Sequence, residues 1–211
     1  MNTESAPTAP SSGARPLSPL VQAAMAAHER GDELTAVASL TVALQQDGAD
    51  TAAQLLRGQV LAAMGQWREA AADAEAVLAH RPDNAEALLL LAAARAATGA
   101  TGPATDALRT LLQEHPDHRP AILLLGRLYA ANGHADLALQ LYDRAIAALP
   151  DFAEAYHARG GVKHQLHDEA GAAEDLQRAL ELSPELARSF DGSYSLLDNS
   201  LKAPASCLHK R

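Results

Sequence analysis

Apolar residues recur along this chain in a helical pattern that repeats every 34 residues, and prolines mark the same period. Pro82, Pro116, Pro150 and Pro184 are each 34 residues apart, and an acidic residue follows each one. A proline followed by an acid ends one helix and favours the next, because proline fits a first helical turn and a carboxylate complements a helix N-terminus. Gly48, another helix terminator, lies one period before Pro82. The period predicts five units, 17–50, 51–84, 85–118, 119–152 and 153–186.

Each unit has small and apolar residues where two packed helices need them. The eighth residue of every unit is glycine or alanine, which lets two helix backbones approach closely, and the twentieth is always alanine. The eighth column holds Ala24, Gly58, Ala92, Gly126 and Gly160, and the twentieth holds Ala36, Ala70, Ala104, Ala138 and Ala172. Positions 24 and 27 hold alanine or larger apolar side chains, with Tyr142 as the one aromatic. These columns agree with the proline period, so we expect two helices per unit and an all-α fold.

The turn within each unit is marked at its fifteenth position. Gly31, Gly65, Gly99 and Gly133 stand there in the first four units, and His167 stands there in the fifth. A helix C-terminus commonly ends on a residue with positive φ, which glycine adopts without strain. The pattern predicts a helix-turn-helix in each unit.

These columns resemble the 34-residue pattern of the tetratricopeptide-repeat family, which has a small residue near position 8, alanine at 20, a bulky residue at 24 and proline at 32. The resemblance covers residues 17–186. It implies a right-handed superhelical solenoid of five helix-turn-helix repeats, each stabilised by stacking on its neighbours. It also implies that the protein binds another polypeptide and is not an enzyme.

The ends of a solenoid must be capped, and the segment after the last repeat offers a cap. Phe190, Tyr194, Leu197 and Leu201 recur at spacings of four, three and four, which makes one apolar helical stripe. We therefore expect a capping helix over residues 187–202. Residues 1–16 are rich in Ser, Thr, Ala and Pro and are expected to be disordered, and 203–211 to form a flexible tail.

Composition narrows the classes of partner. The net charge is −9, with 14 Arg, 3 Lys and no basic run, so a nucleic acid would be repelled on average. No apolar stretch has the length of a secretory signal or a membrane span, so we expect a cytoplasmic protein without membrane insertion. Cys207 is the single cysteine and cannot form an internal disulfide.

The resemblance also implies a binding groove lined by the first helices of successive repeats. In the family, positions 5, 9 and 12 tend to point into this groove. The expected partner-binding residues are Val21, Met25, Leu55, Gln59, Leu89, Ala93, Leu123, Arg127, His157, Gly161 and His164. This groove is apolar through four repeats and polar at the fifth, and the core positions of the family leave its leucines without a structural task. We expect an adaptor or scaffold that binds a partner peptide or helix, with self-association and occupation by the protein's own tail left open.

Two alternatives accompany this hypothesis. The first is a dedicated chaperone or co-chaperone that shields an exported or membrane-bound client. The second is a metal-dependent function of repeat 5, where His157, His164 and His167 could approach Glu154 or Asp168. A strong helical zinc signature has histidines four apart, which this spacing does not match. No phosphate-binding loop, nucleophile elbow or paired carboxylates are visible, so neither a catalytic site nor a cofactor is expected.

Overall fold

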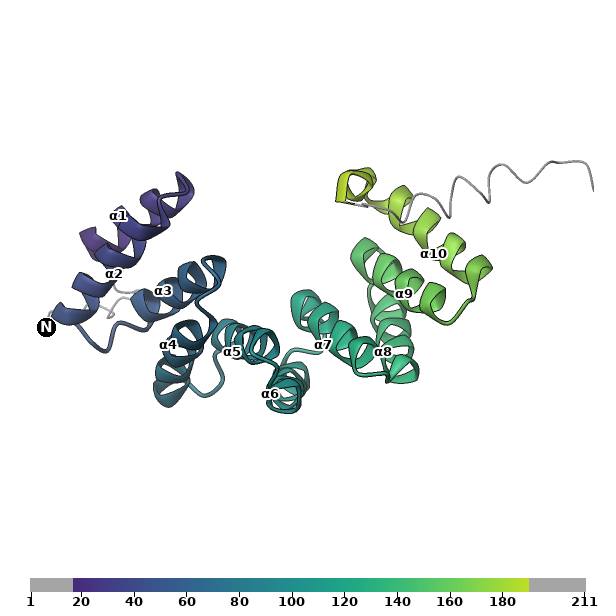
Figure 1. Cartoon of the computed structure of the whole chain (residues 1–211), viewed down its shortest axis with the longest axis horizontal. Helices are drawn as coiled ribbons and strands as arrows, with labels where there is room; N and C mark the ends of the chain where they lie inside the picture. The colour runs from purple at the N-terminus through teal and green to yellow at the C-terminus, as the bar shows by residue number, and fades with distance from the viewer. Residues whose placement is uncertain (1–16, 190–211) are drawn as a thin grey trace, which may run out of the picture.

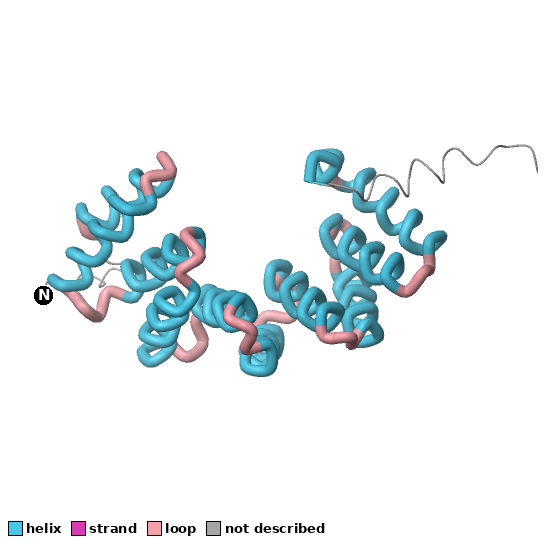
Figure 2. Tube along the Cα trace, in the orientation of Figure 1, coloured by secondary structure: helices cyan, strands magenta, loops and turns pink. Residues whose placement is uncertain are grey.

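The computed structural model describes residues 17–189, which form ten α-helices and one 3₁₀ helix without a strand in that range (Figure 2). The helices are α1 Pro19–Glu29, α2 Glu33–Gln46, α3 Thr51–Ala63, α4 Trp67–His80, α5 Ala85–Ala97, α6 Thr101–Glu114, α7 Arg119–Ala131, α8 Ala135–Ala148, α9 Ala153–Gln165, α10 Glu169–Leu182 and the 3₁₀ helix η1 Pro184–Ser189. The all-α class predicted from the sequence is confirmed. Among residues 17–189, no helix is long and apolar enough to cross a membrane.

Polar side chains at the helix starts explain why several of the helices begin where they do. Asp50 accepts hydrogen bonds from the backbone N–H groups at the start of α3, Asn84 does so for α5, and Asp168 does so for α10. These side chains satisfy backbone donors that have no partner inside the helix. Pro103 and Pro120 lie in the first turns of α6 and α7, where the missing N–H has little effect.

Consecutive helices form hairpins that stack into a curved solenoid. Helices joined by a short turn pack against each other, and each hairpin contacts the next. Figure 1 shows an arc that runs from α1 and α2 at one end to α9 and α10 at the other, with α5, α7 and α9 along its inner side. The first helices also contact each other directly, in the pairs α3–α5, α5–α7 and α7–α9. The inner surface is therefore made of first helices, as the resemblance implied.

Small residues at positions 8 and 20 allow the two helices of a hairpin to approach closely. Ala36, Ala70 and Ala172 are fully buried in this contact, as is Ala24. A Cβ atom added to Gly160 would lie 3.2 Å from the carbonyl oxygen of Ala172, so the close approach depends on its absence. The core thus runs through the whole solenoid as a series of clusters between neighbouring helices.

The described part of the chain ends in a short 3₁₀ helix. Of the capping helix expected over residues 187–202, the structure describes residues 187–189, which belong to the 3₁₀ helix η1. This helix follows directly after α10, and the Leu186 N–H donates to the Ser183 carbonyl oxygen at 3.1 Å, as a 3₁₀ turn requires. Residues 190–202, the expected disordered segment 1–16 and the expected tail 203–211 lie outside the described residues.

Candidate partner-binding groove

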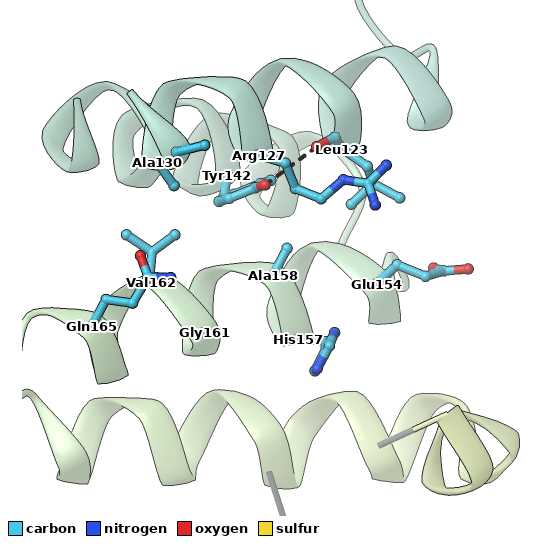
Figure 3. A pocket seen from close by; sticks show the side chains of 11 residues that line it. Leu123, Arg127, Ala130, Tyr142, Glu154, His157, Ala158, Gly161, Val162 and Gln165 are labelled. Atoms are coloured by element: carbon cyan, nitrogen blue, oxygen red, sulfur yellow. Dashed lines mark hydrogen bonds between the residues drawn. The ribbon is translucent and has the colours of Figure 1, made fainter. Parts of the chain in front are cut away.

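A pocket of about 390 Å³ opens between α7 and α9, with one contribution from α8 (Figure 3). Its lining residues are Leu123, Arg127, Ala130, Ala131, Tyr142, Glu154, His157, Ala158, Gly161, Val162 and Gln165. The pocket lies between the first helices of repeats 4 and 5, on the inner side of the arc. A volume of this size is at the lower end of the range for ligand sites and suits one large side chain of a partner.

The charged side chains of the pocket gather toward one end and the smaller apolar ones toward the other, with Leu123 beside Arg127 and Gln165 beside Val162. In Figure 3, Arg127, Glu154 and His157 lie toward the N-terminal parts of α7 and α9, whereas Ala130 and Val162 lie toward their C-terminal parts. Gly161 lies on the apolar side, and a Cβ added there would meet no atom within 4 Å. The missing side chain of Gly161 therefore contributes open space to the pocket.

Tyr142 of α8 closes the pocket behind α7. Its side chain is fully buried, and its hydroxyl donates to the carbonyl oxygen of Leu123 at 3.4 Å. Gly126 on α7 makes room for it, because an added Cβ would overlap the tyrosine ring. Burial raises the pKa of Tyr142 to about 12, while the charge of Arg127 acts in the opposite direction.

His157 lies on the α9 wall of the pocket and is half-buried. Burial lowers its pKa below the ordinary value of 6.5, because removing water disfavours the charged imidazolium. The side chain is therefore neutral at pH 7. Arg127 and Glu154 carry the formal charges of the pocket at that pH.

Sequence comparison connects this architecture to known proteins. Models of the tetratricopeptide repeat match residues 55–119, 99–160 and 153–186, which together extend over 55–186. This chain belongs to the tetratricopeptide-repeat family. The matches include both hairpins that form the pocket.

Similar proteins fall into two groups. Tetratricopeptide repeat protein 36 of Danio rerio is 46% identical over 52 residues, which is 25% of this chain and only 28% of that protein. Solved structures match over more of the chain at lower identity. MamA of Desulfovibrio magneticus RS-1 has a TM-score of 0.68 at 21% identity, covering 82% of this chain and 95% of that one. YrrB, described as a tetratricopeptide-repeat protein with an unusual peptide-binding site, has a TM-score of 0.62 at 20% identity, covering 87% and 91%. These structures share the fold of this chain.

Four of the residues expected in the groove of this tetratricopeptide-repeat protein line the pocket: Leu123, Arg127, His157 and Gly161. His164 lies one turn further along α9, where its Nδ1 is 3.0 Å from Glu169 Oε2. The same pairing occurs in repeat 1, where His28 Nδ1 is 2.7 Å from Glu33 Oε2. These two histidines therefore link the two helices of their own hairpins.

The expected groove residues of the first three repeats are divided between surface and core. Met25 and Gln59 are exposed, and Ala93 is half-buried. Val21, in contrast, is 1% exposed and belongs to the core cluster of the first hairpin. Its side chain offers a partner no surface in this structure.

The interpretation that the groove leucines lack a structural task needs correction. Leu55 is 8% exposed and packs in a core cluster with Leu90 and Leu91. Leu89 and Leu123 are half-buried, and each packs against a core cluster of its own region. Position 5 lies at the edge of the contact between neighbouring first helices, so its side chain is shared between core and inner surface.

The histidines of repeat 5 occupy three different environments. His157 lines the pocket, His164 pairs with Glu169, and His167 lies in the turn before α10 with a φ of 63°. Within residues 17–189, no three histidine, cysteine or carboxylate side chains come together in a way that could hold a metal ion.

The sequence analysis did not include several residues that form the pocket. Ala158 and Val162 flank Gly161 at helical spacing on α9, so a wider helical stripe would have included them. Tyr142 comes from the second helix of its repeat, which the rule of first helices excludes. The sequence does indicate this residue, because Tyr142 at position 24 is larger than the Leu or Ala that the other repeats have there, and Gly126 of the same repeat is small enough to accommodate it.

Proposed function

We propose that this protein is a non-enzymatic adaptor that binds a partner peptide or helix on its inner surface, with the pocket between α7 and α9 as its main anchoring site. The observation that carries the proposal is an open, partly apolar pocket at equivalent positions of two adjacent first helices. Membership of the tetratricopeptide-repeat family supports it, as does the fold shared with YrrB, which is described as having an unusual peptide-binding site.

The size of the pocket limits the affinity it can supply alone. Burying one large apolar side chain contributes about 1.5–3 kcal/mol, which is less than the free energy of even millimolar binding. A useful affinity requires a partner segment that continues along the inner surface and buries roughly 300 Å² of apolar area, worth about 7 kcal/mol before ordering costs. The half-buried Leu89 and Ala93 of α5 are the proposed continuation of this surface.

Filling the pocket from its own wall tests the proposal. The substitution Gly161→Trp places a large side chain in the pocket, and the added Cβ itself meets no atom within 4 Å, so the hairpin is expected to fold. The wild-type chain and the variant are each used to capture proteins from an extract of the source cell, and the captured proteins are measured by quantitative mass spectrometry. The variant should capture about tenfold less, or lower still, of the proteins that the wild type captures.

Two variants control this experiment. Gly161→Ala keeps the pocket open and should capture the same proteins as the wild type. Gly102→Trp makes the same change of residue on α6, outside the pocket, where an added Cβ also meets no atom within 4 Å. It too should leave capture unchanged. Equal capture by the Gly161→Trp and Gly102→Trp variants would show that the pocket is not the binding site.

A further inference from the structure

We propose that the partner segment carries one acidic residue close to a large apolar residue, so that its carboxylate pairs with Arg127 while its apolar side chain enters the pocket beside Gly161. This inference rests on the proposed function and specifies the chemistry of the partner. It is carried by the arrangement of charged and apolar residues around the pocket.

Several arginines of the described chain form no ion pair with a carboxylate, and Arg127 is the one among them that lines the pocket. Five arginines form ion pairs with carboxylates, namely Arg57, Arg95, Arg119, Arg159 and Arg178. Arg127 pairs with no carboxylate among residues 17–189, although it lines the pocket. Its planar guanidinium can donate two parallel hydrogen bonds to one carboxylate, which makes it a specific receptor for an acid.

The surroundings of Arg127 favour an acid over a base as the charged group of the partner. Arg127 lies beside the buried Tyr142, where a bound carboxylate would be partly shielded from water and the attraction strengthened. Arg127 and Glu154 are both exposed in the free chain, and they differ in that Arg127 lies beside the buried Tyr142, whereas Glu154 lies in the first turn of α9. His157 is neutral at pH 7 and does not compete for the acid.

The apolar end defines the second feature of the partner. Ala130, Ala158 and Val162 provide apolar walls, and Gly161 leaves the space open. In Figure 3, Ala130 and Val162 are displaced from the guanidinium of Arg127 along the direction of α7 and α9. One partner segment that runs along these helices can therefore contact both Arg127 and the apolar walls. Neighbouring or nearly neighbouring residues of a partner can therefore supply the acid and the apolar side chain.

The acidic residues on the first helices disfavour a strongly acidic partner. Glu86 of α5 is exposed and occupies the same repeat position as Glu154 of α9. The chain as a whole carries a net charge of −9. A run of acids would be repelled along this surface, whereas a single acid placed at Arg127 would not. The structure thus favours one acid in an otherwise neutral, apolar segment.

Selection from a displayed library of random peptides tests the inference with a defined probe. The purified full chain selects peptides, and the binding of the selected peptides is then measured by fluorescence anisotropy. We expect the selected peptides to share a large apolar residue with Asp or Glu within a few positions of it. The variant Arg127→Gln should weaken their binding by about tenfold, since a charge-assisted pair is lost.

Arg144→Gln is the matched control, because Arg144 is an exposed arginine of α8 outside the pocket and its loss changes the net charge equally. It should change the affinity less than about twofold. Equal weakening by the two variants, or selection of peptides with Lys or Arg in place of the acid, would overturn the inference.

Two further outcomes separate the inference from the function on which it rests. If the selected peptides bind the Gly161→Trp variant as tightly as the wild type, the pocket is not the peptide site and the proposed function itself fails. If a synthetic peptide of residues 190–211 binds as tightly as the selected peptides and shows the same dependence on Arg127, the pocket belongs to the chain's own C-terminal segment. That result would overturn the assignment to a partner.

Discussion

Two ion pairs, each between a partly buried arginine and a buried aspartate, occupy equivalent positions in repeats 2 and 5. Arg57 donates to both carboxylate oxygens of Asp73, at 2.9 and 2.6 Å, and Arg159 does the same to Asp175, at 2.8 and 2.5 Å. Hydrogen bonding to these carboxylates raises the pKa of both guanidinium groups. Repeat 3 has Leu91 and Ala107 at the corresponding positions, so the fold accepts an apolar pair there.

The substitution Asp73→Ala should lower the free energy of unfolding by about 3 kcal/mol, because Arg57 would be left in a largely buried site without its partner. The double variant Arg57→Leu with Asp73→Ala copies the pair of repeat 3 and should recover to within about 1 kcal/mol of the wild type. Urea denaturation of the three proteins measures both values. A double variant that is no more stable than Asp73→Ala would contradict this account of the pair.

At the level of elements, the turns that join the two helices of each hairpin follow one rule with one exception. Gly31, Gly65, Gly99 and Gly133 have φ values of 75°, 76°, 84° and 79°. His167 adopts the same left-handed conformation with a φ of 63°, which strains a residue that has a Cβ. The last hairpin therefore has the least favourable turn in the described solenoid.

Replacing this residue should stabilise the last hairpin. We expect His167→Gly to raise the free energy of unfolding by about 1 kcal/mol, since the strain of a left-handed residue outweighs the added freedom of glycine in the unfolded chain. The reverse substitution, Gly133→His, should destabilise the protein by a similar amount, and its Cβ would meet no atom within 4 Å. Thermal unfolding of both variants measures the effect. A destabilised His167→Gly variant would show that the imidazole contributes more than its strain costs.

For the whole molecule, stability should depend on pH through the half-buried His157. Burial lowers its pKa below 6.5, so the unfolded chain binds a proton more readily than the folded chain. The contribution of His157 is present above about pH 6.5 and is lost as the pH falls through its folded-state pKa. The free energy of unfolding should therefore decline more steeply between about pH 7.5 and 5.5 in the wild type than in His157→Gln.

Urea denaturation at several pH values tests this expectation. Other groups also titrate in this range, so the informative quantity is the difference between the two proteins at each pH. That difference should change as the pH falls below about 6.5. Parallel pH profiles for the wild type and the variant would mean that His157 titrates alike in the folded and unfolded states.

The sequence by itself determined the elements and their order. The 34-residue period, the small residues at positions 8 and 20 and the turn glycines report local requirements, namely where a helix ends and where two backbones must approach. The small residues recur in all five repeats and the turn glycine in four of them, so a single chain contains several copies of the signal. The all-α repeat fold could be predicted for this reason.

Only the tertiary structure decided which repeat positions are buried and which are open. Leu55 and Leu123 share position 5, yet Leu55 is buried against Leu90 and Leu91 while Leu123 lines a pocket. The pocket depends on the absence of a side chain at Gly161 and on Tyr142 from another helix. Burial is set by the side chains that neighbouring repeats bring into contact, and a period along one chain does not contain that information.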